Sequence, residues 1–462
     1  MRIAILAIAA AMASQWAYSA AAPKQLFGET AEQKKERLSW WTEARFGMFI
    51  HFGLYSLPAR HEWIKSLEKT DDAQYDRYFE EFDPDRLDVR DWMARAKRAG
   101  MKYVVLTTKH HEGFCLFDSA LTDYKITKTK YGRDLVREYV DACRAEGLKV
   151  GFYYSLPDWH HPQFPVDRYH PLRPVDCGPW DQRGMEGPEE PWTAINRNRD
   201  MAKYREYIYG QVRELLTNYG KIDLLWFDFT MEGPRTKHPE DWQAEKLIKM
   251  VRELQPQIIV NDRLGLGKTT LDGWDFITPE QRMPDLAEVT RFGKVMPWEL
   301  CQTFSGSWGY HRDENTWKTP KECVELLIRA VSRGGNLIMN VGPTGRGNFD
   351  CRACSRLDAY AQWMADHGRA IYGAGPAPAD FKAPDGTLLT YRPDLGRLYL
   401  HFIDFYPRQA PLALDFIDRV EYAQFLNDAS EIVIRNRLLH MPATAPNVLV
   451  PVAELKIDLV LR

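Results

Sequence analysis

The stretch VVLTTKHHEGF, residues 104–114, decides the fold because an apolar, β-branched run stops abruptly in polar residues. Residues 104–108 predict a buried strand. Four titratable side chains follow at once: Lys109, His110, His111 and Glu112. Such a cluster is costly to bury without partners, so it belongs either to a solvated loop or to a functional site. The rest of the chain decides between the two.

The same pattern recurs along the chain. Eight runs with strand character end in polar residues: MFIHFG (48–53), VVLTTKHH (104–111), VGFYYS (150–155), DLLWFD (223–228), IIVNDR (258–263), DFITPE (275–280), WELCQTF (298–304) and LIMNVGP (337–343). Their polar groups are His51, His110 with His111, Tyr153, Asp228, Arg263, Glu280, Glu299 and Asn340. A single polar strand end would be unremarkable, but eight favour one shared pocket.

Helix-like segments separate most of these runs, at 86–99, 133–147, 198–218, 240–254, 319–333 and 351–369. The connections on either side of DFITPE are short and marked by Gly and Pro. Alternating strands and helices predict an α/β fold, a (β/α)₈-like (TIM) barrel with two degraded outer helices. The βα loops at the C-terminal ends of barrel strands build active sites, so the polar strand ends are expected to surround one.

After Gly373 the pattern changes to short alternating runs separated by Pro, Gly, Asp and Asn. They predict an antiparallel β-sandwich. We therefore divide the chain into a leader at 1–22, a catalytic domain at 23–373 and a C-terminal β-sandwich domain at 374–462.

The N-terminus resembles a secretory signal peptide. Met1 and Arg2 precede an apolar run at 3–13 and the small residues AYSAAA before Pro23. The run is too short to span a membrane. The sequence predicts cleavage between Ser19 and Ala22 and an exported protein, periplasmic or secreted, without a membrane partner after cleavage.

Composition restricts the partners. A net charge of −3 over 462 residues gives no reason to expect nucleic acid or anionic membranes. The aromatic share of 13% suits the apolar faces of sugars, although aromatic side chains also fill cores. The seven cysteines are scattered and predict no disulfide framework, which leaves room for one disulfide. The oligomeric state stays open, and a homo-oligomer is compatible with the sequence.

Asp228 and Glu280 are the candidate catalytic residues. Asp228 shares one strand face with Trp226 in DLLWFD and ends that run. Two carboxylates beside aromatic side chains suit glycoside hydrolysis, in which one attacks and the other protonates the leaving oxygen. Two simpler explanations stay open. Asp228 could cap a helix or pair with a loop arginine, and Glu280 could pair with Arg263 or Arg282.

Glu280 is preferred as the acid over two other glutamates. Glu299 begins its strand run and is therefore expected near the far end of the barrel. Glu62 lies in a loop beside Trp63 and suits a hydroxyl acceptor. The end of the 275–280 run is the place from which a carboxyl reaches to within about 5–5.5 Å of Asp228, the separation of a retaining pair.

Three histidines, His51, His110 and His111, are expected to face the same rim. No HxH or HExxH spacing accompanies them, so metal ligation is not indicated. Core histidines bonded to the backbone are one explanation. Hydrogen bonding to sugar hydroxyls is favoured, because imidazole donates at one nitrogen and accepts at the other. No GxSxG indicates a serine nucleophile.

These residues resemble the α-L-fucosidases of glycoside hydrolase family 29, in order over roughly residues 30–375. The segments that carry the resemblance are RFGMFIHFGLYSLPARHEW (45–63), TKHHEGFCLFDSALTDYKI (108–126), GFYYSLPDW (151–159), LLWFDF (224–229), VNDR (260–263), WDFITPE (274–280), SWGYHRDE (307–314) and GGNLIMNVGPTGRG (334–347). The resemblance implies a (β/α)₈-like domain followed by a β-sandwich.

By that resemblance, Asp228 is the nucleophile and Glu280 looks like the acid/base of part of the family. The positions that match fucose contacts are His51, His110, His111, Tyr153 and Arg263. The positions that match the pocket lining are Glu62, Trp63, Trp226 and Trp308. Three residues depart from the family's pattern: Glu112 for Asp, Leu264 for Trp and Phe229 for Gly.

The sequence thus predicts an exported retaining exo-α-L-fucosidase that acts on fucosylated glycans by double displacement and uses no metal or cofactor. A hydrolase of a related L-sugar such as an α-L-galactoside is the neighbouring alternative. A non-catalytic fucose-binding protein on the same scaffold is the alternative from another class, and intact Asp228 and Glu280 argue against it.

Overall fold

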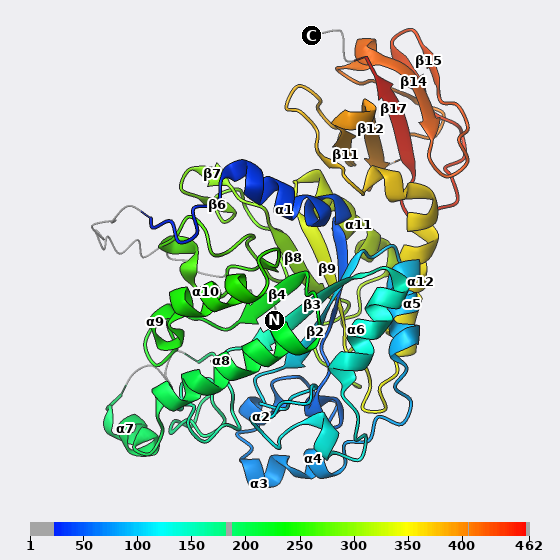
Figure 1. The fold of residues 1–462 in the computed structure, drawn as a ribbon. Coiled ribbons are helices and arrows are strands. Elements are labelled where there is room, and N and C mark those ends of the chain that lie inside the picture. Colours follow the sequence, from blue (N-terminus) through cyan, green and yellow to red (C-terminus); the bar gives the residue numbers. More distant parts are fainter. Residues whose placement is uncertain (1–22, 182–186, 405, 459–462) are drawn as a thin grey trace, which may run out of the picture.

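A curved sheet of seven parallel strands forms the centre of the larger part of the chain (Figure 1). The computed structural model describes residues 23–181, 187–404 and 406–458, so the predicted leader lies outside the described residues. The strands follow the order β5 (Ile259–Val260), β4 (Leu224–Asp228), β3 (Lys149–Ser155), β2 (Tyr103–Lys109), β1 (Phe46–Ile50), β9 (Asn336–Val341) and β8 (Glu299–Thr303).

Long helices cover the outside of this sheet, and all six predicted helical segments are confirmed to within a few residues. They are α5 (Val89–Arg98), α6 (Leu135–Glu146), α8 (Met201–Asn218), the pair α9 (Pro239–Trp242) and α10 (Ala244–Leu254), α11 (Pro320–Ser332) and α12 (Cys351–His367). Short helices lie in the βα loops: α2 (Ile64–Leu67), α3 (Asp72–Tyr75), α4 (Arg77–Glu80) and α7 (Glu190–Asn196).

One expected strand is wrong. Segment 275–280 is no strand, although it lies between β5 and β8 and joins them through single parallel bridges at Phe276, Ile277 and Glu280. The Asp275 carboxylate accepts from the Val260 amide at 2.8 Å, where a backbone carbonyl would accept in a regular strand ladder. Pro279 has no N–H to donate. A regular ladder therefore cannot form, but the segment still closes a (β/α)₈-like barrel.

Asp275 also anchors this segment from outside. Its carboxylate accepts from Arg37 at 2.7 Å and from Arg252 at 2.6 Å. Burial opposes ionisation, but the two guanidinium groups hold the pKa of Asp275 below its ordinary value. Arg37 belongs to α1 (Ala31–Ala44), which the sequence did not indicate.

α1 closes one end of the barrel, and α2, α3 and α4 lie at the other (Figure 1). Leu38, Trp41 and Ala44 of α1 pack into the interior cluster with Phe49 and Phe276. The Trp41 and Phe276 rings lie 4.7 Å apart. Because α1 fills this end, a ligand can enter only from the end formed by the βα loops.

The C-terminal part forms an antiparallel β-sandwich. Its five-stranded sheet has the order β10 (Gly375–Pro376), β11 (Thr387–Arg392), β12 (Arg397–Phe402), β17 (Val452–Ile457) and β14 (Val420–Phe425). The three-stranded sheet has the order β13 (Pro411–Leu412), β16 (Leu438–His440) and β15 (Val433–Arg435). A separate hairpin of β6 (Thr290–Arg291) and β7 (Lys294–Val295) belongs to the barrel side.

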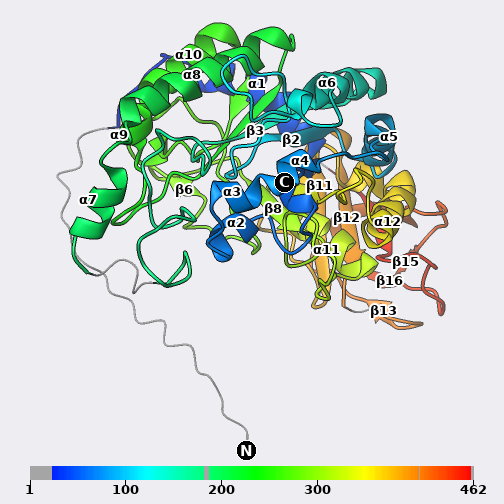
Figure 2. The same ribbon diagram turned by 90° about the horizontal axis from the view of Figure 1, so that it is seen from below.

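The sandwich lies against α11 and α12, on the side of the barrel away from α7 to α10 (Figure 2). Trp363 of α12 donates its indole N–H to the Val450 carbonyl at 2.9 Å, and Thr390 of β11 donates to the Ala370 carbonyl at 2.8 Å. All seven cysteines lie among the described residues and are free thiols. No described helix has the length and apolar character needed to cross a membrane.

Candidate active site

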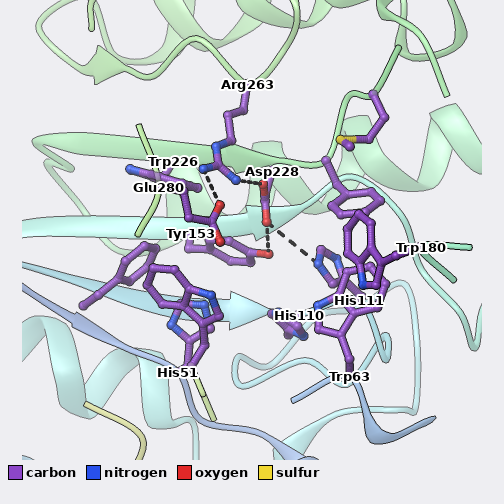
Figure 3. A pocket seen from close by; sticks show the side chains of 14 residues that line it. His51, Trp63, His110, His111, Tyr153, Trp180, Trp226, Asp228, Arg263 and Glu280 are labelled. Atoms are coloured by element: carbon purple, nitrogen blue, oxygen red, sulfur yellow. Dashed lines mark hydrogen bonds and ion pairs between the residues drawn. The ribbon is translucent and has the colours of Figure 1, made fainter. Parts of the chain in front are cut away.

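A pocket opens at the C-terminal ends of the barrel strands (Figure 3). The pocket and its open mouth together enclose about 600 Å³. Ten of the eleven residues singled out from the sequence line it: His51, Trp63, His110, His111, Tyr153, Trp226, Asp228, Arg263, Glu280 and Trp308. The fold thus brings together groups separated by as many as 257 positions, the interval from His51 to Trp308.

Asp228 is the last residue of β4 and is almost wholly buried. Its Oδ2 accepts a hydrogen bond from the Tyr153 hydroxyl at 2.8 Å, and its Oδ1 accepts from Arg263 Nη1 at 2.8 Å. The Nε2 atom of His111 lies 3.8 Å from Oδ2. These contacts fix the carboxylate at the pocket wall, where a bound sugar can reach it.

Arg263 connects the two candidate carboxylates. Its Nη1 bonds Asp228, and its Nη2 donates to Glu280 Oε2 at 2.8 Å. Its Nε donates to the Thr278 hydroxyl at 3.0 Å, and its guanidinium carbon lies 4.5 Å from the Trp226 ring. Burial opposes the charge, but the carboxylates of Asp228 and Glu280 outweigh it and raise the pKa of Arg263 above its ordinary value.

Glu280 enters the pocket from the irregular segment 275–280, and 42% of its side chain is exposed. The ion pair with Arg263, one of the two simpler explanations for Glu280, is present. It does not remove Glu280 from the site, because the same guanidinium holds Asp228. Because one guanidinium group joins the two carboxylates, the distance between them cannot exceed two hydrogen bonds plus the width of that group. Such proximity suits two carboxyl groups that act on the same glycosidic bond.

His111 presents an unprotonated nitrogen to the pocket. The Ser155 hydroxyl donates to the Pro157 carbonyl at 2.7 Å, so it accepts from His111 Nδ1, which lies 2.7 Å away. Burial, with the charges of Lys109 and Arg263, lowers the pKa of His111 to about 3. The imidazole is therefore neutral, with its lone pair on Nε2.

His51 has the same tautomer for a similar reason. Asn340 donates its amide N–H to the Trp308 carbonyl at 2.6 Å, which leaves its Oδ1 to accept from His51 Nδ1 at 2.7 Å. Burial lowers the pKa of His51 to about 3. Two neutral rings thus offer acceptors, and sugar hydroxyls are the donors that match them.

The His110–His111 turn is held from behind by a buried ion pair. Lys109 Nζ lies 3.3 Å from Asp158 Oδ2, and both side chains are sealed from solvent. The Trp159 amide donates to the His111 carbonyl at 2.7 Å. The β2–β3 register shifts between Thr107 and Lys109, and both histidine rings face the pocket, with centroids 4.1 Å apart. Of the four polar residues that end the 104–114 stretch, His110 and His111 line the pocket, and Lys109 supports them from behind.

Glu62 does not line the pocket, which corrects the expectation for this residue. It is buried behind Trp308, and its Oε2 accepts from the amides of Trp308 and Gly309 at 3.0 Å each. The same loop crosses Gly342, where a Cβ would lie 2.6 Å from the Tyr310 nitrogen and 2.8 Å from the Trp308 carbonyl oxygen. Glu62 therefore positions the loop that carries Trp308.

Glu299 does not line the pocket, which corrects its inclusion among the eight polar strand ends. It lies far from the mouth, in agreement with its place at the start of β8. It is fully buried and accepts from Trp41 Nε1 at 3.2 Å, from the Tyr103 hydroxyl at 2.6 Å and from Trp226 Nε1 at 3.3 Å. Burial raises its pKa to about 7. Glu299 accepts from three neutral donors and has no path to the pocket. It therefore stabilises the barrel interior.

Four lining residues were not among the predicted site residues: Phe49, Trp180, Phe229 and Met231. Phe49 precedes His51 by two positions in a strand, so both side chains lie on the same face. This spacing indicated that Phe49 lines the pocket. Phe229 stood out as a departure from the family's glycine. Trp180 lies in the long β3–α7 loop, and nothing in its local sequence indicates a site.

No group of three His, Cys, Asp or Glu side chains among the described residues is placed to hold a metal ion. Two carboxyl groups at one pocket, with aromatic side chains beside them, suit cleavage of a glycosidic bond. A barrel that carries them at its open end belongs to the class of glycoside hydrolases.

Comparison with known proteins gives the family. The family model described as α-L-fucosidase matches residues 14–369, so the chain belongs to the α-L-fucosidase family. The tissue α-L-fucosidase of Mus musculus is 29% identical over 361 residues, 73% of this chain and 72% of the mouse protein.

Solved structures agree. The α-L-fucosidase isoenzyme 1 from Paenibacillus thiaminolyticus superposes with a TM-score of 0.80 and 41% identity, covering 92% of this chain and 99% of that one. A family 29 α-L-fucosidase from Bacteroides thetaiotaomicron gives a TM-score of 0.75 and 27% identity over 92% of this chain and 96% of that one. That structure is described as a covalent intermediate trapped with 2-fluoro-fucosyl fluoride in a Glu-to-Gln mutant.

Proposed function

We propose that this chain is a retaining exo-α-L-fucosidase that removes terminal α-L-fucosyl residues from glycans through a covalent fucosyl-enzyme. One observation carries the proposal: a single guanidinium, that of Arg263, bonds both Asp228 and Glu280 at 2.8 Å at one pocket. The catalytic roles match those that the family resemblance implies.

In the first step an oxygen of Asp228 attacks the anomeric carbon while the bond from that carbon to the glycosidic oxygen breaks. Glu280 gives its proton to the departing oxygen. Arg263 contacts Oε2 of Glu280, so Oε1 is the oxygen that carries the proton. Tyr153 and Arg263 each bond one oxygen of Asp228, which fixes the direction of attack.

In the second step the ionised Glu280 takes a proton from water. The resulting hydroxide equivalent attacks the same carbon, and the bond to Asp228 breaks. Two inversions restore the α configuration and return both carboxyl groups to their first state. No metal or cofactor takes part, because the two carboxyl groups supply the nucleophile and the proton.

Binding of one sugar ring explains the remaining groups. The Nε2 atoms of His51 and His111 accept from hydroxyl groups. Because His111 Nε2 lies beside the Asp228 carboxylate, its donor is the 2-hydroxyl, the proton-bearing group next to the anomeric carbon. Phe49, Trp226 and Trp308 offer apolar surface to the methyl group at C5.

The trapped covalent intermediate of the B. thetaiotaomicron relative supports both parts of this mechanism. A covalent bond to the sugar requires a nucleophile on the enzyme, and trapping in a Glu-to-Gln mutant fits a glutamate with a proton-transfer role. Here Asp228 and Glu280 are proposed for those roles.

Turnover of an aryl α-L-fucoside tests the activity, and NMR of the first-formed product tests the stereochemistry. We expect release of α-L-fucose. First-formed β-L-fucose would overturn double displacement. Binding of fucose without any turnover would indicate the non-catalytic alternative, and faster turnover of an aryl α-L-galactoside would indicate the related-sugar alternative.

We also propose that the protein is exported, on the basis of the leader pattern at 1–22. The mature N-terminus, determined by mass spectrometry of the protein purified from its own host, is expected between residues 20 and 23. A mature chain that retains Met1 in the cytoplasm would contradict export.

A further inference from the structure

Trp180 is an exposed aromatic side chain at a pocket whose other aromatic residues are buried or, in the case of Trp308, half-buried. Its exposed fraction is 53%, whereas those of Trp63, Trp226 and Phe229 are below 10%. Leaving a large apolar ring half in water forgoes the stabilisation that burial would give. Because Trp180 also lines the pocket, its exposed ring is a candidate contact for a bound ligand.

The backbone of Trp180 is fixed on both sides. Arg168 donates from Nε to the Pro179 carbonyl at 3.1 Å and from Nη2 to the Asp181 carbonyl at 3.3 Å. Arg168 is itself buried, and its amide donates to the Arg235 carbonyl at 3.0 Å. One buried guanidinium thus holds the carbonyls that flank the exposed ring, which pre-organises it for a ligand.

Aromatic side chains support the Trp180 ring from behind. Its centroid lies 5.0 Å from that of Trp63, 4.9 Å from Tyr169 and 6.2 Å from Phe229. Phe229 takes part at a cost, because its φ of 83° lies in the left-handed region, a strain of about 1–3 kcal/mol. The same Phe229 ring packs 4.7 Å from Tyr169 and 4.9 Å from His111, and this packing holds the strained conformation.

The two exposed members of the lining mark the mouth of the pocket. They are Trp180, at 53% exposure, and Glu280, whose side chain is 42% exposed. Figure 3 shows them on opposite sides of Asp228. The sugar that Asp228 attacks fills the buried part. The group attached through the oxygen that Glu280 protonates must extend outward, between these two residues.

We infer that Trp180 is the binding platform for the leaving group, and that this group is a second pyranose whose apolar face stacks on the indole. The C–H groups on one face of a pyranose match an aromatic face in shape and polarity. This inference rests on the proposed function, whose acid, Glu280, defines where the leaving oxygen lies. It assigns to Trp180 the discrimination between substrates by their leaving group.

Two kinds of substrate distinguish a role of Trp180 in binding the leaving group from a role in binding the fucose ring. α-L-Fucosyl fluoride has a leaving group too small to touch Trp180, whereas a fucosyl-α-galactose or fucosyl-α-N-acetylglucosamine disaccharide places a ring on it. We expect Trp180→Ala to lower kcat/KM about tenfold for the better disaccharide, mainly through KM, and to stay within about twofold of wild type for the fluoride.

Two further variants serve as controls. Trp180→Phe keeps an aromatic face and should recover most of the activity on the disaccharide. Tyr422→Ala removes a ring that is 41% exposed on β14 of the sandwich, remote from the pocket. It should change kcat/KM for neither substrate.

Three results would overturn the inference. An equal loss on the fluoride and the disaccharide would show that Trp180 shapes the sugar pocket. An unchanged kcat/KM of Trp180→Ala on both disaccharides would show that the mouth holds no stacked ring. Wild-type protein that turns over neither the fluoride nor an aryl fucoside would refute the proposed function, and the inference with it, so the two failures are distinguishable.

Discussion

The two ends of the barrel each enclose a carboxylate that accepts from a tyrosine hydroxyl, yet only one of these carboxylates lines a pocket. At the loop end Asp228 accepts from Tyr153 at 2.8 Å and faces the pocket. At the α1 end Glu299 accepts from Tyr103 at 2.6 Å and faces only protein. Trp226 connects them, because its N–H donates to Glu299 and its ring lies under Arg263.

The partners differ in charge as well as in access. Asp228 is paired with the Arg263 cation at 2.8 Å. The neutral donors on Glu299 do not compensate its burial, and its pKa rises to about 7. A perturbed pKa alone would have pointed to Glu299 as the functional carboxyl. The comparison teaches that access to the pocket, which Asp228 has and Glu299 lacks, selects the proposed nucleophile, whereas the size of a pKa shift does not.

The largest expected effect comes from Asp228→Ala. It should lower kcat by several orders of magnitude, because it removes the covalent route, while the melting temperature stays close to wild type. Steady-state turnover of an aryl fucoside measures kcat, and thermal unfolding measures the melting temperature. Near-wild-type turnover by the folded variant would show that the loop end does not work as proposed.

Glu280→Ala should have the next largest effect. Loss of a general acid costs about 10²–10⁴-fold on glycans with poor leaving groups, and fucosides with good leaving groups should keep their first step. Azide should restore turnover and give a fucosyl azide, because it needs no general base. Glu62→Ala is the matched control. If azide rescues that variant or Glu299→Ala, the acid is misassigned.

Glu299 is expected to govern stability. Glu299→Leu leaves three buried donors without an acceptor, at about 1–3 kcal/mol each. Thermal unfolding should show a large decrease, whereas Glu299→Gln, which still accepts, should lose less. A Leu variant as stable as wild type would remove the contrast between the two ends.

The same residue predicts a pH dependence. Its pKa rises from an ordinary 4.5 to about 7 on folding, so the folded protein binds the proton more tightly. The contribution of Glu299 to stability is thus present below pH 4.5 and is lost as the pH rises through 7, by roughly 3 kcal/mol. Denaturant unfolding of wild type and Glu299→Gln should differ by a pH-dependent amount. A constant difference would contradict the raised pKa.

The smallest expected effects come from a matched pair of tyrosines. Tyr153→Phe removes the hydroxyl that bonds Asp228 and should lower kcat/KM about tenfold, since a hydrogen bond to a charged group is worth about 1.5–3 kcal/mol. Tyr103→Phe removes the hydroxyl that bonds Glu299. It should leave kcat/KM within about twofold and lower the free energy of unfolding by about 1–2 kcal/mol. Equal effects on activity would mean that the two ends are not separate in function.

Much of the barrel was readable from local pattern. Burial on both faces makes the central parallel strands near-continuous apolar runs. The polar residue at the end of most runs marks the rim, whereas Glu299 begins its strand and lies at the other end of the barrel. Asp228 was placed by the two-residue period of its strand, and each predicted helix follows from amphipathic spacing. These signals depend on neighbours in the chain, so one sequence contains them.

Contacts between distant segments decided the rest. Segment 275–280 has the apolar content of a strand, but the Asp275 carboxylate takes a backbone position in the ladder, and Arg37, 238 positions away, anchors it. Glu62 turned from the pocket because amides 246 and 247 positions away bind it. The tautomers of His51 and His111 follow from Asn340 and Ser155, which local sequence does not connect to them.

The sequence by itself determined the barrel class, the rim and the pair of carboxyl residues, because hydrophobic periodicity and strand-end polarity are local properties. The tertiary structure decided that Arg263 joins Asp228 to Glu280 and that Arg168 presents Trp180 at the mouth. A pairing energy depends on which groups meet and how far water is excluded. Both are fixed only when the whole chain has folded.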